Sequence, residues 1–163
     1  MTNRRGLLGW TALGIAGAAL GGCGRATAVT AERFSVVMSD EAWKRKLGPD
    51  AWAVLRREGT ETPFTSPLND EHRAGIFACK GCALPLFASR TKFDSGTGWP
   101  SFWAPLAQAV ATKSDTSLLG ERTEVHCRRC GGHLGHVFDD GPRPTGQRYC
   151  MNGVAMTFTP GSA

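Results

Sequence analysis

A long run of strongly apolar residues is missing from this sequence of 163 residues. An uncharged stretch near the N-terminus, residues 6–22, is built mostly from Leu, Ala and Gly, whereas a membrane-spanning helix needs about 20 predominantly apolar residues. Low-complexity tracts are missing as well, and 41% hydrophobic with 20% charged residues is typical of a globular chain. The length favours one domain, and 21 Gly with 9 Pro favour short strands and turns over long helices. We therefore expect a mainly β fold.

A strong excess of basic charge is also missing. The 19 Lys and Arg against 14 Asp and Glu give a net charge of +5, but Arg4 and Arg5 lie in a segment that resembles an export signal. Without these two residues the net charge is +3, which is a weak basis for binding nucleic acid. We expect no nucleic-acid partner.

The N-terminal segment is typical of an export signal. Two adjacent arginines precede the uncharged stretch and fit a twin-arginine signal, and the sequence LGGC, which ends at Cys23, resembles a bacterial lipoprotein cleavage site. This interpretation divides the chain into a signal over 1–22, a tether over 23–33 and a domain over 34–163, with the sulfur of Cys23 lipidated. An uncleaved N-terminal anchor is the alternative. In either case we expect the domain to work outside the cytoplasm, in the cell envelope, close to a membrane.

Short helices are expected at the start of the domain and short strands after them. Ser39 is a suitable N-cap for a helix that Gly48 ends, and Pro49 suits the first turn of a second helix that Gly59 ends. Later runs bounded by Gly, Pro, Asp or Cys are typical of antiparallel strands. They are GIFAC, LPLFAS, TEVHC, HVFDD and VAMTF.

Four of the six cysteines form two CxxC pairs, Cys79 with Cys82 and Cys127 with Cys130. Each pair places two sulfurs across a tight turn, and two such knuckles supply the four thiolates that Zn²⁺ favours in a closed structural site. The 44 residues between the pairs exceed the spacing of a simple zinc ribbon, so one metal ion would join distant parts of the domain. Disulfides, which an exported protein can form, and redox-active CxxC motifs are the alternatives.

Cys150 is the thiol that remains if four cysteines bind metal and a fifth carries lipid. In an extended strand Arg148, Cys150 and Asn152 lie on one face, and a nearby cation favours the reactive thiolate. His133 and His136, three residues apart, are able to hold or pass a proton near neutral pH. The pattern is consistent with a nucleophilic site, and also with a core cysteine among surface and hydrogen-bonding residues.

Several segments together resemble the B-type peptide methionine sulfoxide reductases. They are SGTGWPSF over 95–102, RTEVHCRRCGGHLGHVFDDGPRPTGQRYCMNG over 122–153, and the four knuckle cysteines. The resemblance extends from about Phe34 to Phe158. It implies two antiparallel β-sheets with short N-terminal helices and one structural Zn²⁺ far from the active site. It also implies an enzyme that reduces the R epimer of methionine sulfoxide, preferably within proteins, and we expect a monomer.

The resemblance implies a role for each residue of the candidate catalytic site. Cys150 corresponds to the nucleophile, which attacks the sulfoxide sulfur and becomes a sulfenic acid as methionine leaves. His133 and His136 correspond to imidazoles that supply a proton to the oxygen and organise the site. Asp140 corresponds to an acidic residue of the same loop.

Three further positions complete the implied site. Arg148 and Asn152 correspond to residues that poise the thiolate and orient an imidazole. Trp99 corresponds to the indole that packs on the methyl group of the substrate, and a soft thioether methyl is a suitable partner for an aromatic ring.

One position departs from the family pattern. Many members carry a resolving cysteine two residues before the tryptophan of GWPSF, and this chain has Thr97 there. The chain is therefore similar to the one-cysteine members. In these an external thiol, either a thioredoxin-like protein or a small molecule, reduces the sulfenic acid.

Two other functions fit parts of the sequence. A zinc-knuckle module that binds nucleic acid is supported by Arg128 and Arg129, but it needs neither Trp99 nor Cys150. A metal hydrolase that uses the paired histidines as ligands lacks the HExxH pattern and its glutamate base, and it predicts a second bound metal ion.

Overall fold

The computed structural model describes residues 32–116 and 120–162. The internal contacts divide the chain into two units, Met1–Glu32 and Arg33–Ala163, and the helices and strands given below belong to the second unit. The expected export signal, Cys23 and most of the tether lie outside the described residues. Within the described part of the chain, no helix is long and apolar enough to cross a membrane.

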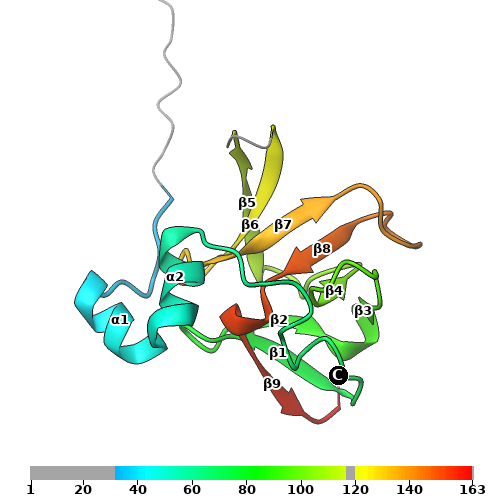
Figure 1. The fold of residues 1–163 in the computed structure, drawn as a ribbon, viewed down its shortest axis with the longest axis horizontal. Coiled ribbons are helices and arrows are strands. Elements are labelled where there is room, and N and C mark those ends of the chain that lie inside the picture. The colour runs from blue at the N-terminus through cyan, green and yellow to red at the C-terminus, as the bar shows by residue number, and fades with distance from the viewer. Residues whose placement is uncertain (1–31, 117–119, 163) are drawn as a thin grey trace, which may run out of the picture. The chain divides into compact units, whose positions relative to one another are not determined.

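Two short helices open the second unit, α1 Asp40–Leu47 and α2 Pro49–Arg57. The predicted N-cap is confirmed, because Ser39 Oγ accepts a hydrogen bond from the backbone N–H of Ala42 at 3.2 Å. Gly48 separates the helices with a φ of +75°, which glycine adopts without strain. Figure 1 shows the two helices next to each other, beside the sheets. Each buries one face, with Trp43 and Leu47 from α1 and with Ala51, Val54 and Leu55 from α2.

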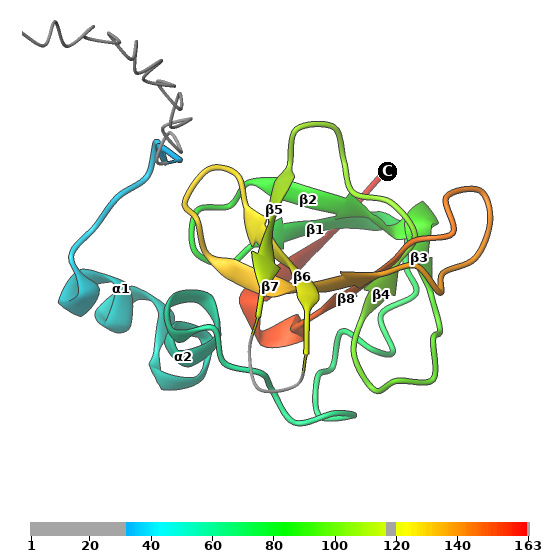
Figure 2. The ribbon, with the colours of Figure 1, turned by 90° about the horizontal axis from the view of Figure 1, so that it is seen from above.

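The body of the unit consists of two antiparallel sheets, which confirms the predicted fold class. Figures 1 and 2 show the two sheets from two directions. The smaller sheet has the order β2-β1-β9, with β2 Pro85–Ala88, β1 Gly75–Cys79 and β9 Met156–Pro160. The larger sheet has the order β3-β4-β8-β7-β6-β5, with β3 Lys92–Phe93, β4 Ser101–Phe102, β8 Arg148–Met151, β7 His133–Phe138, β6 Arg122–Cys127 and β5 Val110–Asp115. Two 3-10 helices, η1 Ser89–Thr91 and η2 Gly153–Ala155, precede β3 and β9.

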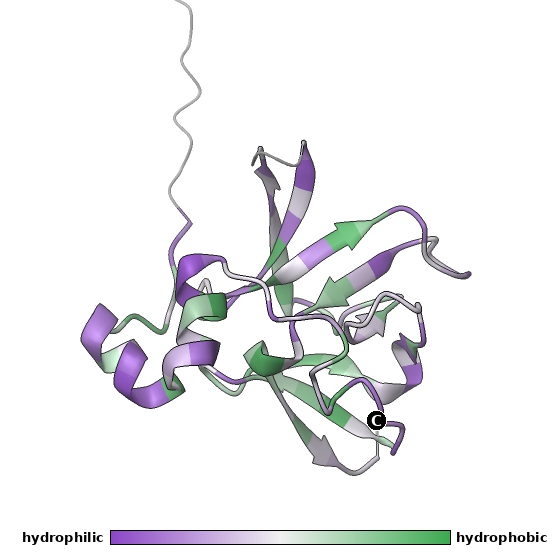
Figure 3. Ribbon diagram, in the orientation of Figure 1, coloured by the Kyte–Doolittle hydropathy of each residue, from purple (hydrophilic) through white to green (hydrophobic). Residues whose placement is uncertain are grey.

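Aromatic side chains from both sheets form the centre of the core. Phe77 of β1 and Phe87 of β2 contact Phe102 of β4, with ring centroids 4.9 and 4.3 Å from that of Phe102. All three side chains are fully buried, and burying a phenylalanine stabilises a fold by roughly 1.5–3 kcal/mol. Figure 3 shows hydrophobic residues in parts of the strands and hydrophilic residues along α1. The core therefore holds the smaller sheet against β4, next to β8.

Candidate active site

One transverse row of the larger sheet passes through Cys150. Cys150 of β8 pairs with Ser101 of β4 on one side and with His136 of β7 on the other. His136 pairs in turn with Glu124 of β6, and Glu124 pairs with Lys113 of β5. Side chains directly opposite one another share a face of the sheet. A thiol, an imidazole, a carboxylate and an ammonium group therefore follow one another from β8 to β5.

Cys150 lines a small pocket of about 120 Å³. A site for a drug-sized ligand occupies roughly 300–1,000 Å³, so this pocket suits a single side chain. It brings together four of the residues predicted from the sequence with four that were not predicted. The lining residues are Trp99, His136, Cys150 and Asn152, with Thr60, Arg122, Gly135 and Phe138.

A glycine allows β7 to approach β8 at this pocket. Gly135 pairs with Met151 and has a φ of +155°. A Cβ atom at this position would lie 2.1 Å from the carbonyl oxygen of Cys150, which is far inside a van der Waals contact. Any larger residue would move the strand that carries the thiol.

Hydroxyl groups adjoin the Cys150 thiol. Thr97 Oγ1 lies 3.8 Å from Cys150 Sγ, and Ser95 Oγ lies 2.8 Å from Thr97 Oγ1 and 2.7 Å from Ser101 Oγ. Burial raises the pKa of the Cys150 thiol above its ordinary value, while the Thr97 contact and the charge of Arg148 oppose this effect without cancelling it. The resting thiol is therefore protonated at neutral pH and has to lose its proton before it acts as a nucleophile.

His136 is the imidazole opposite Cys150. Its Nε2 lies 2.8 Å from Asp115 Oδ2, and the same oxygen accepts a hydrogen bond from Arg122 Nη2 at 2.7 Å. Burial lowers the pKa of His136 below its ordinary value, and the charge of Arg122 adds to this effect while Asp115 opposes it. The ring is therefore neutral near pH 7. Since a carboxylate only accepts hydrogen bonds, Nε2 carries the proton and Nδ1 is the basic atom.

His133 lies beside His136 but does not line the pocket. The two ring centroids are 5.4 Å apart in an edge-on arrangement. His133 Nδ1 bonds to Glu124 Oε1 at 3.0 Å, and the two side chains are 3% and 4% exposed. Its buried Nε2 has no hydrogen-bond partner among the residues that the structure describes. The contact with Glu124 places the proton on Nδ1 and leaves Nε2 as a hydrogen-bond acceptor.

A chain of ion pairs extends this contact to the end of α2. Glu124 Oε2 lies 2.8 Å from Lys113 Nζ, which lies 2.7 Å from Glu58 Oε1. Burial opposes ionisation of Glu124, but hydrogen bonds from His133 and Lys113 outweigh burial and hold the pKa of Glu124 below its ordinary value. The hydrogen bonds to Glu124 and Glu58 raise the pKa of Lys113 to about 12. The buried carboxylate therefore stays charged at neutral pH.

Arg148 and Asp140 lie beside the pocket rather than in it. Arg148 donates two hydrogen bonds of 2.8 Å to the carboxylate of Asp140, and its guanidinium lies 4.4 Å from the ring centroid of Phe138. The side chain of Asp140 is 63% exposed. Arg148 is thus fixed on the face that carries Cys150, two residues along the same strand, where its charge favours the thiolate.

The backbone around Glu61 holds Trp99 and Asn152 in place. The carbonyl oxygen of Glu61 accepts a hydrogen bond from Trp99 Nε1 at 3.1 Å, and its N–H donates to Asn152 Oδ1 at 2.9 Å. The Glu61 carboxylate accepts hydrogen bonds from the backbone N–H groups of Gly153 and Val154. Asn152 Nδ2 donates to the carbonyl oxygen of Leu134 at 3.0 Å. These bonds of the Asn152 amide go to backbone groups, so its predicted action on an imidazole stays a prediction.

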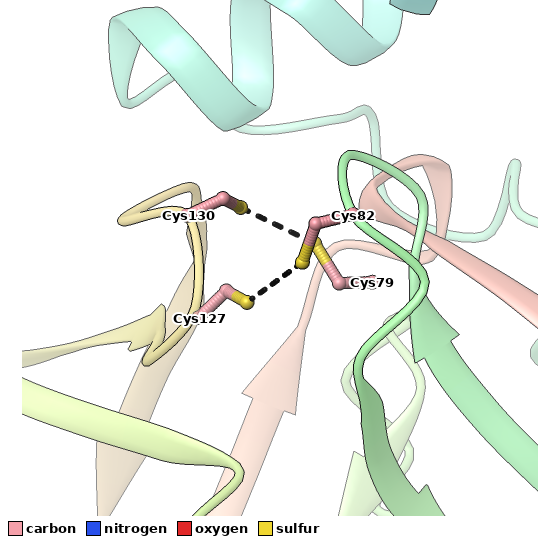
Figure 4. Close-up of side chains that lie close together, drawn as sticks. All are labelled: Cys79, Cys82, Cys127 and Cys130. Carbon is pink, nitrogen blue, oxygen red and sulfur yellow. Dashed lines mark hydrogen bonds between the residues drawn. The ribbon is translucent and has the colours of Figure 1, made fainter. Parts of the chain in front are cut away.

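The four knuckle cysteines lie together where the two sheets meet, as Figure 4 shows. Their sulfurs lie within 4.8 Å of one another, with Cys79 Sγ 3.7 Å from Cys130 Sγ and Cys82 Sγ 3.5 Å from Cys127 Sγ. A disulfide would place two sulfurs about 2.05 Å apart. Four thiolates around Zn²⁺ at about 2.3 Å lie roughly 3.8 Å from one another. The spacing fits a tetrahedral metal site that joins the turn after β1 to the turn between β6 and β7.

Hydrogen bonds among the four thiols move their pKa values in opposite directions. Hydrogen bonds from Cys127 and Cys79 lower the pKa of Cys130 to about 4, and a hydrogen bond from Cys79 lowers the pKa of Cys82 to about 7. The pKa values of Cys79 and Cys127 are raised, by hydrogen bonds to Cys127 and Cys130 respectively. The negative charge of each thiolate opposes ionisation of the remaining thiols, and a bound cation would neutralise that charge.

Known proteins resemble most of this chain. A curated relative from Leifsonia xyli subsp. xyli (strain CTCB07), named peptide methionine sulfoxide reductase MsrB, is 54% identical over 129 residues, which cover 78% of this chain and 93% of the relative. A protein of the same name from Leptospira interrogans serogroup Icterohaemorrhagiae serovar Lai (strain 56601) is 49% identical over 126 residues, or 77% and 96% of the two chains. Residues 47–160 match the family model described as the SelR domain. The chain belongs to the MsrB family. It is accordingly an oxidoreductase.

Among solved structures, the crystal structure of the Mis18 'Yippee-like' domain aligns with 56% of this MsrB chain and with 100% of its own length. The sequence identity is 17% and the TM-score is 0.46.

The MsrB site contains residues that sequence reasoning did not single out. Three of them, Glu61, Asp115 and Glu124, bond to predicted residues directly. The other three, Glu58, Lys113 and Arg122, bond to these or to one another. A signal for two of them was present in the segment RTEV, because Arg122 and Glu124 alternate along a strand and so share a face. Glu61 carried no such signal, because it lies in a turn-rich stretch without periodicity.

Proposed function

We propose that this chain reduces the R epimer of methionine sulfoxide in proteins to methionine, with Cys150 as the nucleophile. The observation that carries the proposal is the pocket of about 120 Å³ in which a thiol, an imidazole and an indole converge. Cys150 is also the one cysteine of the described residues that is not part of the metal-type cluster.

In the net reaction the sulfoxide oxygen passes to Cys150 Sγ. Methionine sulfoxide gains two electrons and leaves as methionine, while the thiol is oxidised to a sulfenic acid. The thiol proton leaves as the sulfur attacks the sulfoxide sulfur, and the oxygen takes up a proton as its bond to sulfur breaks. His136, neutral and held by Asp115, accepts the thiol proton at Nδ1 and returns it to the oxygen. Once the oxygen has taken up this proton, its O–H group donates a hydrogen bond to Nε2 of His133, whose Nδ1 is held by Glu124.

Selection of one epimer follows from fixing three groups around the chiral sulfur. Cys150 approaches the sulfur, the indole of Trp99 receives the methyl group, and the imidazoles receive the oxygen. The other epimer would exchange the methyl group and the oxygen. The polar oxygen would then face the indole and lose its hydrogen bonds, which is costly in a site that excludes water.

Recycling of the sulfenic acid needs an external thiol. Thr97 occupies the position from which a second cysteine would act, 3.8 Å from Cys150 Sγ, and the tetrad cysteines are engaged with one another. One thiol of a thioredoxin-like protein or of a small molecule condenses with the sulfenic acid, releasing water and leaving a mixed disulfide. A second thiol then reduces that disulfide and restores Cys150.

The cysteine tetrad completes the proposal as a structural Zn²⁺ site with one ion per chain. Cys79, Cys82, Cys127 and Cys130 supply a closed shell without a position for substrate, so the ion contributes folding energy rather than chemistry. The sulfur spacing given above supports this assignment.

Export and anchoring form the last part of the proposal. Residues 1–22 act as the export signal, Cys23 carries the lipid, and residues 23–33 tether a monomeric domain over 34–163. The substrates are then oxidised proteins of the cell envelope. Labelling with radioactive palmitate in the producing cell tests this part, because substitution of Cys23 by Ser removes the label if Cys23 carries the lipid.

The decisive experiment measures turnover of separate R and S sulfoxides with dithiothreitol as the thiol donor. The chain should reduce the R epimer, and Cys150→Ser should reduce neither while its zinc content, measured by elemental analysis, is unchanged. Turnover retained in Cys150→Ser, or equal turnover of both epimers, would contradict the proposal.

A further inference from the structure

A second and larger cavity adjoins the catalytic pocket. Its volume is about 660 Å³, which lies within the range of roughly 300–1,000 Å³ found for ligand sites. Its walls come from α2, from residues 59–68, and from η2 with the start of β9. The proposed reaction leaves this cavity without a role.

The two cavities adjoin each other at residues 60 and 61. Thr60 lines both of them. The next residue, Glu61, holds the indole of Trp99 through its carbonyl oxygen on the side of the catalytic pocket, and it lines the larger cavity itself. Asn152 lines the smaller cavity and its neighbour Gly153 lines the larger one. A chain that enters the catalytic pocket with one side chain therefore has the larger cavity next to its backbone.

The catalytic pocket has room for one side chain, so the flanking residues of a protein substrate have to lie outside it. The larger cavity offers aliphatic contacts for side chains and hydroxyl groups for peptide N–H and C=O groups. The aliphatic lining residues are Ala53, Val54, Leu68, Val154 and Met156, and the hydroxyl-bearing ones are Thr60, Thr62, Thr65 and Ser66. A mainly apolar wall with a few polar groups is the usual lining of a binding cleft.

The charges in this cavity do not favour an ionic ligand. Asp50 and Lys80, both exposed, carry opposite charges. The carboxylate of Glu61 is already bonded to the backbone N–H groups of Gly153 and Val154. The lining therefore matches an uncharged stretch of polypeptide better than a phosphate or a nucleotide.

We propose that this cavity is a subsite for the residues that flank methionine sulfoxide in a protein substrate. The inference rests on the proposed function, and it locates the preference for protein-bound sulfoxide in the walls formed by α2 and residues 59–68. A free sulfoxide would use the catalytic pocket alone.

The test compares two substrates of the full chain, an uncharged octapeptide with a central R-methionine sulfoxide and the same residue capped as N-acetyl methylamide. The wild-type chain should show a kcat/KM at least tenfold higher for the peptide. Thr62→Trp, which fills the cavity from an exposed position, should lower the peptide-to-capped-residue ratio of kcat/KM at least tenfold. Asp50→Trp, on α2, should do the same and serves as the second variant if Thr62→Trp does not fold.

The matched control is Thr159→Trp, an exposed threonine of β9 that lines neither cavity, and it should leave the ratio unchanged. Equal losses on both substrates, or a peptide advantage that survives both cavity variants, would overturn the inference. If sedimentation shows dimers of the wild-type chain that Thr62→Trp dissociates, the inference is overturned too, because a second copy would then be the occupant.

If the wild type reduces neither substrate, the proposed function fails. Fluorescence anisotropy then measures binding of the labelled peptide to the wild-type chain and to Thr62→Trp. The subsite is supported if the peptide binds the wild type and if Thr62→Trp weakens this binding at least tenfold.

Discussion

Replacing Glu124 by Gln tests whether the buried carboxylate sets the hydrogen-bonding state of His133. The amide has the shape of the carboxylate but no charge, and it offers Nδ1 either an oxygen or an NH₂ group. The proton is then no longer confined to Nδ1, and Nε2 is no longer available as an acceptor in every molecule. We expect kcat to fall about tenfold to a hundredfold, less than the roughly 10²–10⁴-fold that a proton-transfer group itself contributes, because Glu124 acts through His133. KM should change little, since neither Glu124 nor His133 lines the pocket.

The stability effect follows from the same contacts. The side chains of Glu124 and His133 are 4% and 3% exposed, whereas that of Lys113 is 52% exposed and keeps its bond to Glu58. A charge-assisted hydrogen bond contributes roughly 1.5–3 kcal/mol and a neutral one roughly 0.5–1.5 kcal/mol. With the contribution of exposed Lys113 discounted, the free energy of unfolding should fall by about 1–2 kcal/mol.

This stability difference should depend on pH. The pKa of Glu124 in the folded chain lies below its ordinary value of 4.5. Its charge therefore stabilises the fold above pH 4.5, and this contribution is lost as the pH falls through the folded pKa. Urea unfolding of the wild type and of Glu124→Gln should differ at pH 7 and converge below pH 4.5.

The control for Glu124→Gln is Glu58→Gln, at the exposed end of the same ion-pair chain. It should change kcat less than twofold and stability by less than about 0.5 kcal/mol. ¹⁵N NMR of the imidazole distinguishes positioning from general destabilisation. In the wild type and in Glu58→Gln, His133 should carry its proton on Nδ1 alone, whereas in Glu124→Gln the proton should be shared between Nδ1 and Nε2. An unchanged kcat in Glu124→Gln, or equal losses in both variants, would refute the reasoning.

Three further predictions concern the thiol, its cation and the metal. Thr97→Cys should yield a disulfide between position 97 and Cys150 after one turnover without reductant, because Thr97 Oγ1 lies 3.8 Å from Sγ; a mass gain of one oxygen instead would contradict this. Arg148→Gln should move the alkaline limb of the kcat/KM profile, where Cys150 loses the proton that the oxygen needs, to higher pH, because burial already raises the pKa of Cys150 and Arg148 opposes this; an unmoved limb would contradict this role of Arg148. Cys79→Ser should lower bound zinc to less than a tenth of an ion per chain and lower the melting temperature, and full zinc content would refute the tetrad assignment.

The local structure of this chain was largely predictable because short-range rules determine it. The strand predicted at GIFAC is β1, and Ser39 caps α1 as expected. The end of α2 differs by one residue, because Gly59 was expected to end the helix and the C-cap is Glu58, which has a left-handed φ of 55°. The residue at this C-cap therefore carries a side chain, and the Glu58 carboxylate contacts Lys113.

The candidate site was predictable in its residue types but not in its contacts. The two-residue spacing of Arg148 and Cys150 predicted that both side chains lie on one face of a strand, and both residues do lie in β8. Spacing alone does not give the partner of an imidazole, because that depends on strand register. His136 pairs in register with Glu124 but bonds to Asp115, whereas His133 takes the Glu124 carboxylate. A register irregularity between Val125 and His126 accompanies this exchange of partners.

The four-cysteine cluster and the transverse row through Cys150 are joined by the same two strands, β6 and β7. The second knuckle, Cys127 to Cys130, is the turn that connects β6 to β7, with Glu124 three residues before it and His133 three residues after it. A turn fixes the register of the hairpin that it closes, and a slip of one residue would turn the imidazoles to the opposite face of the sheet. An ion that holds the knuckle closed therefore keeps Glu124 opposite His136, and His136 opposite Cys150, without touching any of the three. The proposed ion is structural in its coordination, yet its loss should lower kcat in any fraction of the chain that stays folded.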